Sequence, residues 1–279
     1  MREFDVQDLI EPIRKMCIDA NYFLPQDVKN KLLEMKSEEE FGTAQAVLTD
    51  ISDNFNLAAT QHVPICQDTG MCCVFLKLGQ DVHLNGDLYE AVNEGVRRGY
   101  RDGYLRKSVV EDPLRRVNTG DNTPAVIYTD IVPGDKIEIT VAPKGFGSEN
   151  MSRLAMLKPS DGEQGVKDFI IETVKIAGPN PCPPIIVGVG IGGTFDRAAL
   201  LAKRALMRPV DVRNDDPYYK EMEEELLEKI NSLGIGPQGF GGLTTALAVN
   251  IETYPTHIAG LPVAVNINCH VTRHVTQTI

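Results

Sequence analysis

Three of the six cysteines occupy settings that could present a thiol to a ligand. Cys66 lies in a polar turn (VPICQDTG, 63–70), Cys182 lies among prolines (GPNPCPP, 178–184), and Cys269 follows an apolar run (NINCH, 266–270). The prolines that flank Cys182 exclude a helix or a central strand there. All three thiols therefore lie in loops or at strand ends, where functional groups concentrate. No CxxC pair is present, so the spacing does not favour a zinc ribbon or a ferredoxin-type site.

If these three thiols converge, their number indicates the chemistry. Four thiolates are usual for an electron-transfer cluster. Three thiolates on a four-iron cluster would leave one iron open to substrate, where it could polarise a hydroxyl leaving group or a carboxylate. Spacing alone leaves open that the three cysteines are unrelated. Cys17, on the apolar face of a helix, and Cys72 and Cys73, on opposite faces of an apolar strand, are predicted to be core thiols.

Composition limits the classes of function. The 279 residues are 42% hydrophobic and 24% charged, as in an ordinary globular protein. A net charge of −11 argues against a general nucleic-acid binder and requires local basic groups to attract an anionic substrate. No run approaches the roughly 20 apolar residues of a membrane helix. The N-terminus lacks a secretory pattern, so we expect a cytoplasmic chain with reduced cysteines.

The elements that must position these thiols are predicted to form an α+β fold. We expect one domain, 1–279, with a helical N-terminal layer over 1–60 followed by mixed α/β segments with short strands over 61–279. No internal repeat is detected. Helices are predicted over 4–20, 40–60, 86–104, 165–177, 193–207 and 217–233. Another helix is predicted to begin after the first one, with Pro25 in its first turn. Strands are predicted over 71–78, 185–189, 244–252 and 262–268, with a hairpin of 125–131 and 136–142 around residues 133–135.

The chain resembles the alpha subunit of two-subunit class I (iron–sulfur) fumarases and of L-tartrate dehydratases, because several sequence segments match that family in the same order. They are PICQDTG (64–70), LRKS (105–108), KGFGSEN (144–150), PNPCPP (179–184), GVGIGGTFD (188–196) and THIAGLPVAVNINCH (256–270). In that family three cysteines bind a [4Fe–4S] cluster with one open iron. By position, the resemblance assigns these ligands to Cys66, Cys182 and Cys269.

The resemblance also implies roles for other residues. Asp68 matches a carboxylate that acts in proton transfer, and His257 matches a histidine near the substrate; both are the expected catalytic residues. Gln67 and Arg106 match residues that bind substrate carboxylates, which suits the fork of an arginine. Gly147 matches a loop glycine whose backbone approaches the substrate.

The family's catalytic assembly needs a beta part, and this sequence ends at Ile279 without one. The resemblance therefore implies an alpha subunit that is active only with a separate beta subunit, in a hetero-oligomer. NINCHVTRH resembles fumarase alpha chains more than tartrate dehydratase ones, so we expect fumarate and L-malate as the substrate pair. The alternatives are an L-tartrate dehydratase alpha subunit and a non-enzymatic regulatory or assembly subunit that binds zinc.

Three other patterns have simpler interpretations. Residues 188–193 fit G-x-G-x-x-G, but the segment 207–210 is a poor second strand for a dinucleotide-binding unit. We expect instead that the helix N-terminus after this motif faces the cluster or an anionic substrate. His270 and His274 have i, i+4 spacing, which is weak support for zinc. The run 221–228 is expected to be a solvated helix face.

Overall fold

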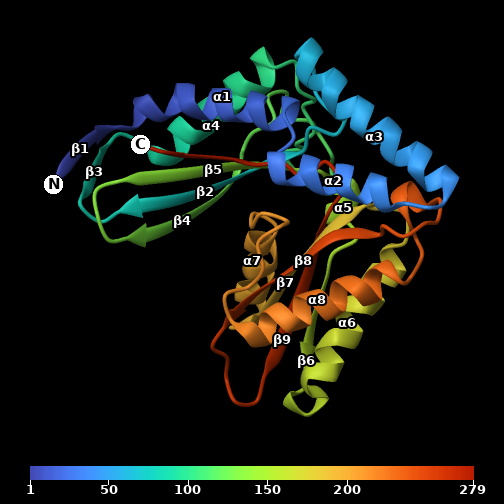
Figure 1. Ribbon diagram of the computed structural model, residues 1–279. Helices are drawn as coiled ribbons and strands as arrows, with labels where there is room; N and C mark the ends of the chain where they lie inside the picture. The colour runs from blue at the N-terminus through green and yellow to red at the C-terminus, as the bar shows by residue number, and fades with distance from the viewer. The chain divides into compact units, whose positions relative to one another are not determined.

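Two mixed four-stranded sheets organise the chain in the computed structural model, which describes residues 1–279 (Figure 1). Contacts divide the chain into unit 1 (1–24, 55–146 and 273–279) and unit 2 (25–54 and 147–272). Each unit contains helices and one of these sheets, which confirms the α+β class. The single domain stays a prediction. None of the helices is long and apolar enough to cross a membrane.

Unit 1 places the Cys66 loop directly before a central strand. Its sheet has the order β10-β5-β2-β4, and a separate pair joins β1 to β3. Helices α1 and α4 lie side by side against the sheet (Figure 1), where Cys72, Val74 and Leu76 alternate into the shared core. The elements of unit 1 are β1 (Arg2–Asp5), η1 (Val6–Leu9), α1 (Ile10–Tyr22), β2 (Met71–Gly79), β3 (Val82–Asn85), α4 (Leu88–Asp102), β4 (Val126–Val132), β5 (Ile137–Lys144) and β10 (Val275–Thr278).

The predicted hairpin of β4 and β5 is wrong. Both strands exist, but β2 lies between them, parallel to β4 and antiparallel to β5. The four connecting residues can extend to about 13 Å, enough to step over the roughly 10 Å between strands that are second neighbours. Gly79 permits the crossing, because a Cβ there would lie 2.4 Å from the Gly134 carbonyl oxygen.

The start of the first helix also differs from the prediction over 4–20. The chain begins as β1, which pairs in parallel with β3, and then forms the 3-10 turn η1. Helix α1 begins at Ile10, so Pro12 falls in its first turn, where a missing N–H costs little. Pro25 stands one residue earlier than predicted, as the N-cap residue of α2.

Unit 2 surrounds a fully buried central strand. Its sheet has the order β6-β9-β7-β8, and every residue of β7 is buried. Helix α7 packs on one face of this sheet, and α6 and α8 share the core on the other. The elements of unit 2 are α2 (Gln26–Glu38), β6 (Arg153–Leu157), η2 (Pro159–Asp161), α6 (Gly162–Ala177), β7 (Ile185–Gly192), α7 (Phe195–Ala205), α8 (Pro217–Asn231), η3 (Pro237–Gly239), β8 (Ala246–Tyr254) and β9 (Leu261–Asn268). Helices α3 (Gly42–Gln61) and α5 (Phe146–Glu149) each have residues in both units.

The glycine-rich motif 188–193 serves helix packing. A Cβ at Gly188 would lie 2.3 Å from the carbonyl oxygen of Ala202, and one at Gly190 would lie 2.1 Å from that of Ala198. Only glycine therefore lets α7 approach β7 so closely. Residues 207–210 form no strand, as predicted.

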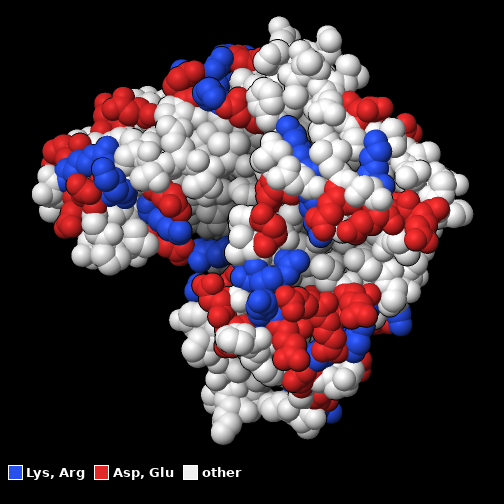
Figure 2. Space-filling view, in the orientation of Figure 1, with Lys and Arg blue, Asp and Glu red and all other residues white.

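Helix α8 carries the acidic run predicted to face solvent. Glu221, Glu224 and Glu228 are exposed, and acidic side chains gather over this helix in Figure 2. Glu223 is the exception, because it is buried in a pair with Arg208 and accepts hydrogen bonds from backbone N–H groups. A buried carboxylate needs such partners.

Candidate functional site

The six cysteines separate by exposure as their sequence settings predict. Cys17, Cys72 and Cys73 are buried, which confirms their assignment to the core. Cys17 Sγ lies 4.0 Å from Cys72 Sγ, and this contact together with burial raises the pKa of Cys72. The remaining three, Cys66, Cys182 and Cys269, are partly or fully exposed, and none of the six is in a disulfide.

In unit 1 the Cys66 loop (residues 66–70) has a defined set of backbone contacts. The N–H of Asp68 donates to Cys66 Sγ at 3.4 Å. The Asp68 carboxylate accepts from the N–H of Gly70 at 3.0 Å and from that of Phe146 at 2.9 Å. Gly145 allows this approach, since a Cβ there would lie 3.1 Å from Asp68 Oδ2. The thiol and the carboxylate are therefore held in one loop.

Thr69 brings Arg106 to the same loop. Its buried hydroxyl accepts from the N–H of Arg106 at 2.9 Å and donates to the Arg106 carbonyl at 3.2 Å. Gln67 is exposed, and its Oε1 lies 3.4 Å from Cys66 Sγ. Unit 1 thus gathers Cys66, Gln67, Asp68 and the backbone of Arg106, which are four of the predicted site residues.

In unit 2 the segments of Cys182 and Cys269 meet. Nδ1 of His270 lies 3.0 Å from the Cys182 carbonyl oxygen and 3.2 Å from Nε2 of Gln238. Cys182 has a φ of +56°, a strained conformation for a residue with a side chain. The turn after Cys269 is closed by a 2.7 Å hydrogen bond from Asn268 to Thr272.

Gly147 is exposed in the short helix α5, with open space where a Cβ would be. Two residues later, Glu149 pairs with Lys203 at 2.6 Å and accepts from Asn266 at 2.6 Å. Asn266 lies on β9, three residues before Cys269. This network ties the segment of Gly147 to the strand that ends in Cys269.

His257 is not brought to these cysteines within unit 2. It lies in the loop between β8 and β9, at the carboxyl end of β7, whereas Cys182 and Cys269 lie at the amino end. An eight-residue strand separates the two ends by about 26 Å. Helix α7 begins at the same end as His257 and therefore away from Cys182 and Cys269, so the expectation that its N-terminus faces the cluster or an anionic substrate stays a prediction.

Nearly the whole chain matches the model of one protein family. The family described as "Fumarate hydratase (Fumerase)" matches residues 10–278. The chain belongs to the Fumerase family. This result confirms the resemblance carried by the six sequence segments.

Relatives of this Fumerase-family chain have names that specify one substrate, L(+)-tartrate. A Methanocaldococcus jannaschii protein named "Putative L(+)-tartrate dehydratase subunit alpha" is 46% identical over 268 residues, or 94% of each chain. The "L(+)-tartrate dehydratase subunit alpha" of Escherichia coli O157:H7 is 37% identical over 95% of this chain and 88% of its own. That of Escherichia coli K12 is 35% identical over the same shares. These names match the tartrate alternative better than fumarate hydratase.

The residues of this Fumerase-family chain suit an anionic cluster in their chemistry. No three His, Cys, Asp or Glu side chains lie together as a ready metal site, and the predicted ligands are divided between unit 1 (Cys66) and unit 2 (Cys182, Cys269). All three are loop thiols rather than core thiols. Beside Asp68, buried Arg273 has two nitrogens, Nε and Nη1, without a hydrogen-bond partner. An orphaned guanidinium in this place suits a negatively charged group.

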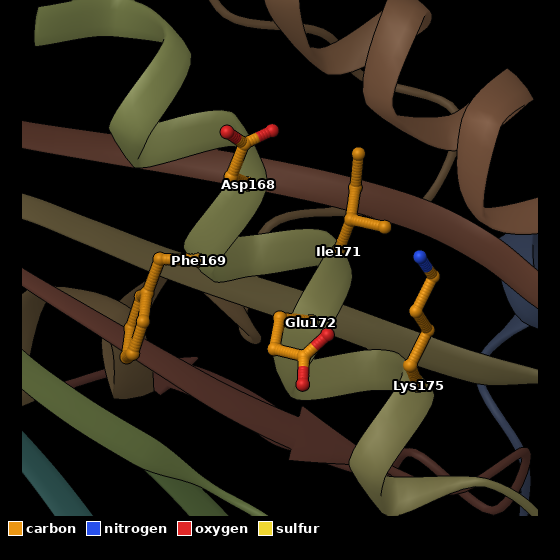
Figure 3. A pocket seen from close by; sticks show the side chains of 5 residues that line it. All are labelled: Asp168, Phe169, Ile171, Glu172 and Lys175. Carbon is orange, nitrogen blue, oxygen red and sulfur yellow. The ribbon is translucent and has the colours of Figure 1, made fainter. Parts of the chain in front are cut away.

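Sequence reasoning missed the buried polar residues around the Cys66 loop. Thr69 lies inside the PICQDTG segment, and Arg273 lies three residues after the end of the THIAGLPVAVNINCH segment. Their closeness in sequence to Cys66 and Cys269 was the available signal. Tyr100 and Asn122 carried no such signal. The open hollow on α6, lined by Asp168, Phe169, Ile171, Glu172 and Lys175, contains no predicted site residue (Figure 3).

Proposed function

We propose that this chain is the alpha subunit of a [4Fe–4S]-dependent hydro-lyase that acts on a four-carbon dicarboxylate. The observation that supports it most is the joining of the Cys66 thiol, the Asp68 carboxylate and Arg106 in one loop system of unit 1. This arrangement combines a thiolate ligand, a proton-transfer group and a carboxylate-binding group. Such a combination is what dehydration of a hydroxy acid requires.

Each residue has a proposed role. Cys66, Cys182 and Cys269 would hold the cluster, which supplies a Lewis-acid iron for the departing hydroxyl group. Asp68 moves a proton, with its carboxylate oriented by the N–H groups of Gly70 and Phe146. For the substrate, we propose that Gln67 and Arg106 bind its carboxylates and that the Gly147 backbone approaches it. The catalytic role of His257 rests on the resemblance alone, because its loop lies at the opposite end of β7 from Cys182 and Cys269.

L-tartrate is the first substrate to test, because the relatives are named L(+)-tartrate dehydratase subunits. Fumarate and L-malate are the second, because the family is described as fumarate hydratase and the segment NINCHVTRH resembles fumarase alpha chains. L-tartrate has one hydroxyl more than L-malate. A site that hydrogen-bonds this hydroxyl would reject L-malate strongly.

The word "subunit" in these relatives' names supports a partner chain. We therefore propose a separate beta subunit that completes the active site in a hetero-oligomer. Coexpression of this chain with the beta-type chain of its source, purification without oxygen and cluster reconstitution provide the test. We expect dehydration of L-tartrate or hydration of fumarate by the pair and neither by the alpha chain alone. A colourless protein with stoichiometric zinc would instead support the regulatory alternative.

Substitution of single cysteines tests the ligand assignment. Cys182→Ser should lose the iron and the visible absorption of the cluster, because its strained loop thiol is a proposed ligand. Cys73→Ser should retain both, since Cys73 is buried in the core of unit 1. The measurement is iron and sulfide content per chain after anaerobic reconstitution. Equal iron in the two variants contradicts the assignment.

A further inference from the structure

Three successive carbonyl groups of the Cys66 loop are hydrogen-bonded by three buried side chains. Arg273 Nη2 donates to the carbonyl of Asp68. The Tyr100 hydroxyl contacts the carbonyls of Thr69, at 2.8 Å, and Gly70, at 3.0 Å. Asn122 Nδ2 donates to the Gly70 carbonyl at 3.1 Å. Arg273 is 4% exposed and the other two 0%, so we refer to Arg273, Tyr100 and Asn122 as the carbonyl clamp.

The carbonyl clamp determines where the remaining groups of the loop are directed. With its carbonyls engaged, the loop uses the N–H of Asp68 for Cys66 Sγ and the N–H of Gly70 for the Asp68 carboxylate. Buried backbone groups are nearly always paired, so loss of one clamp contact would force the loop to find another arrangement. The carboxylate of Asp68 would move with it.

Arg273 differs from the other two members because it is charged. Its Nε and Nη1 are buried without a partner, and its one acceptor is the neutral carbonyl of Asp68. Burial of a charge that no carboxylate neutralises is costly, so stability alone does not account for an arginine here. The positive charge of Arg273 beside Asp68 instead stabilises negatively charged groups in the Cys66 loop and any anionic ligand that binds there.

We propose that Arg273 is a positioning residue for Asp68, acting through the Asp68 carbonyl, and that its buried charge stabilises the anionic groups of the site. This inference rests on the proposed function for the role of Asp68. The hydrogen bonds themselves belong to the alpha chain alone. They can therefore be tested without the cluster, the substrate or the beta subunit.

The first test is hydrogen–deuterium exchange of the cluster-free alpha chain, followed by mass spectrometry of the peptides that cover residues 66–71. Arg273→Met should speed exchange there by about tenfold, because a released loop opens locally. Arg273→Lys keeps a charge and a donor and should remain within about threefold of the original chain. Arg14→Met is the control, since it removes an arginine that pairs with Asp102 in the same unit. Unchanged exchange in Arg273→Met overturns the proposal.

The second test uses the reconstituted pair of chains. Arg273→Met should lower kcat by roughly 100-fold, because misplacement of a proton-transfer group slows chemistry. KM should stay within about threefold, because Arg106 still binds the substrate. The reduction potential of the cluster should become more negative in Arg273→Met and return toward the original value in Arg273→Lys. A rise in KM with kcat unchanged overturns the assignment.

Two further outcomes separate the proposals. If Arg273→Met does not fold, Tyr100→Phe carries the exchange test, because it removes one hydroxyl that contacts two loop carbonyls. A wild-type pair without hydro-lyase activity refutes the proposed function, while faster exchange in Arg273→Met still supports the clamp. Full activity in the wild-type pair with unchanged exchange and kcat in the variant refutes only the role of Arg273.

Discussion

At the scale of single residues, Thr69 links two motifs that are far apart in the sequence. Its hydroxyl accepts a hydrogen bond from the N–H of Arg106 and donates one to the carbonyl of Arg106. The side chain of Arg106 itself is exposed. Thr69 therefore controls where the proposed carboxylate-binding side chain begins.

Replacement of Thr69 by valine, which has the same shape, should release Arg106. Loss of the two hydrogen bonds costs about 1–3 kcal/mol, so KM for the dicarboxylate should rise by about tenfold with kcat less affected. Thr69→Ser keeps the hydroxyl and should restore KM. Steady-state kinetics of the pair with its beta subunit provide the measurement. A Thr69→Val enzyme with an unchanged KM would show that Arg106 is positioned by other contacts.

Local sequence predicted some parts of this site and not others. The division of the cysteines into core and loop thiols was predictable, because flanking prolines and strand alternation are short-range signals. Asn122 and Arg273 were not, since they reach the Cys66 loop from 52 and 205 residues away in the sequence. The approach of Phe146 to Asp68 has a separation of 78 residues and was equally hidden.

At the scale of elements, the glycines of β7 make a prediction about packing. Gly190→Ala would place a Cβ 2.1 Å from the Ala198 carbonyl in α7, where the backbone cannot yield cheaply. We expect a loss of about 3 kcal/mol in the free energy of unfolding, as for other overpacked cores. Gly42→Ala is the control, because nothing lies within 4 Å of its Cβ and helix α3 favours alanine. Urea unfolding of both variants gives the comparison, and equal midpoints would contradict the packing argument.

Some helices and strands could be predicted from the sequence, whereas the strand order could not. Long periodic segments such as α4, α8 and β2 were predicted within a few residues, because one face of each is continuously apolar. The hairpin failed because strand order depends on β2, more than fifty residues earlier, and not on the turn. The short strands β6 and β10 at the sheet edges were missed, since none of their residues is fully buried and they give no continuous apolar run.

At the scale of the whole molecule, the two sheets repeat one arrangement although the sequence shows no internal repeat. In each unit the central strand (β2 or β7) has a parallel neighbour on one side and an antiparallel neighbour on the other. The loop before the central strand is contacted by the segment after the antiparallel strand: Phe146 reaches Asp68, and His270 reaches Cys182. Fold topology thus generates the same kind of loop junction twice, once for each group of predicted ligands.

Acid stability is a property of the whole chain, whose net charge is −11. Hydrogen bonds from Arg101 and Arg14 lower the pKa of Asp102 to about 2. Burial alone would raise the pKa of Asp121, but hydrogen bonds from Arg97 and Thr123 outweigh it and bring that pKa to about 2. A depressed carboxyl pKa contributes stability that is present above the ordinary value of 3.8. This contribution is lost as pH falls through the folded value.

The cluster-free chain should therefore keep its resistance to urea from neutral pH to about pH 4 and lose it steadily toward about pH 2. Asp121→Asn should lower the urea midpoint at pH 7 and reduce its fall in acid, because the substituted side chain no longer titrates. Asp81→Asn, which removes an exposed carboxylate of the same unit, should retain the full acid decline. Asn122 lies between Asp121 and Thr123 in the sequence, and the Asp121 carboxylate accepts hydrogen bonds from Thr123 and from Arg97. Protonation of Asp121 should therefore also loosen the carbonyl clamp. Hydrogen exchange of residues 66–71 should then become faster, relative to its intrinsic rate, over the same pH range. A decline in stability without faster exchange in this segment would contradict the link between Asp121 and the carbonyl clamp.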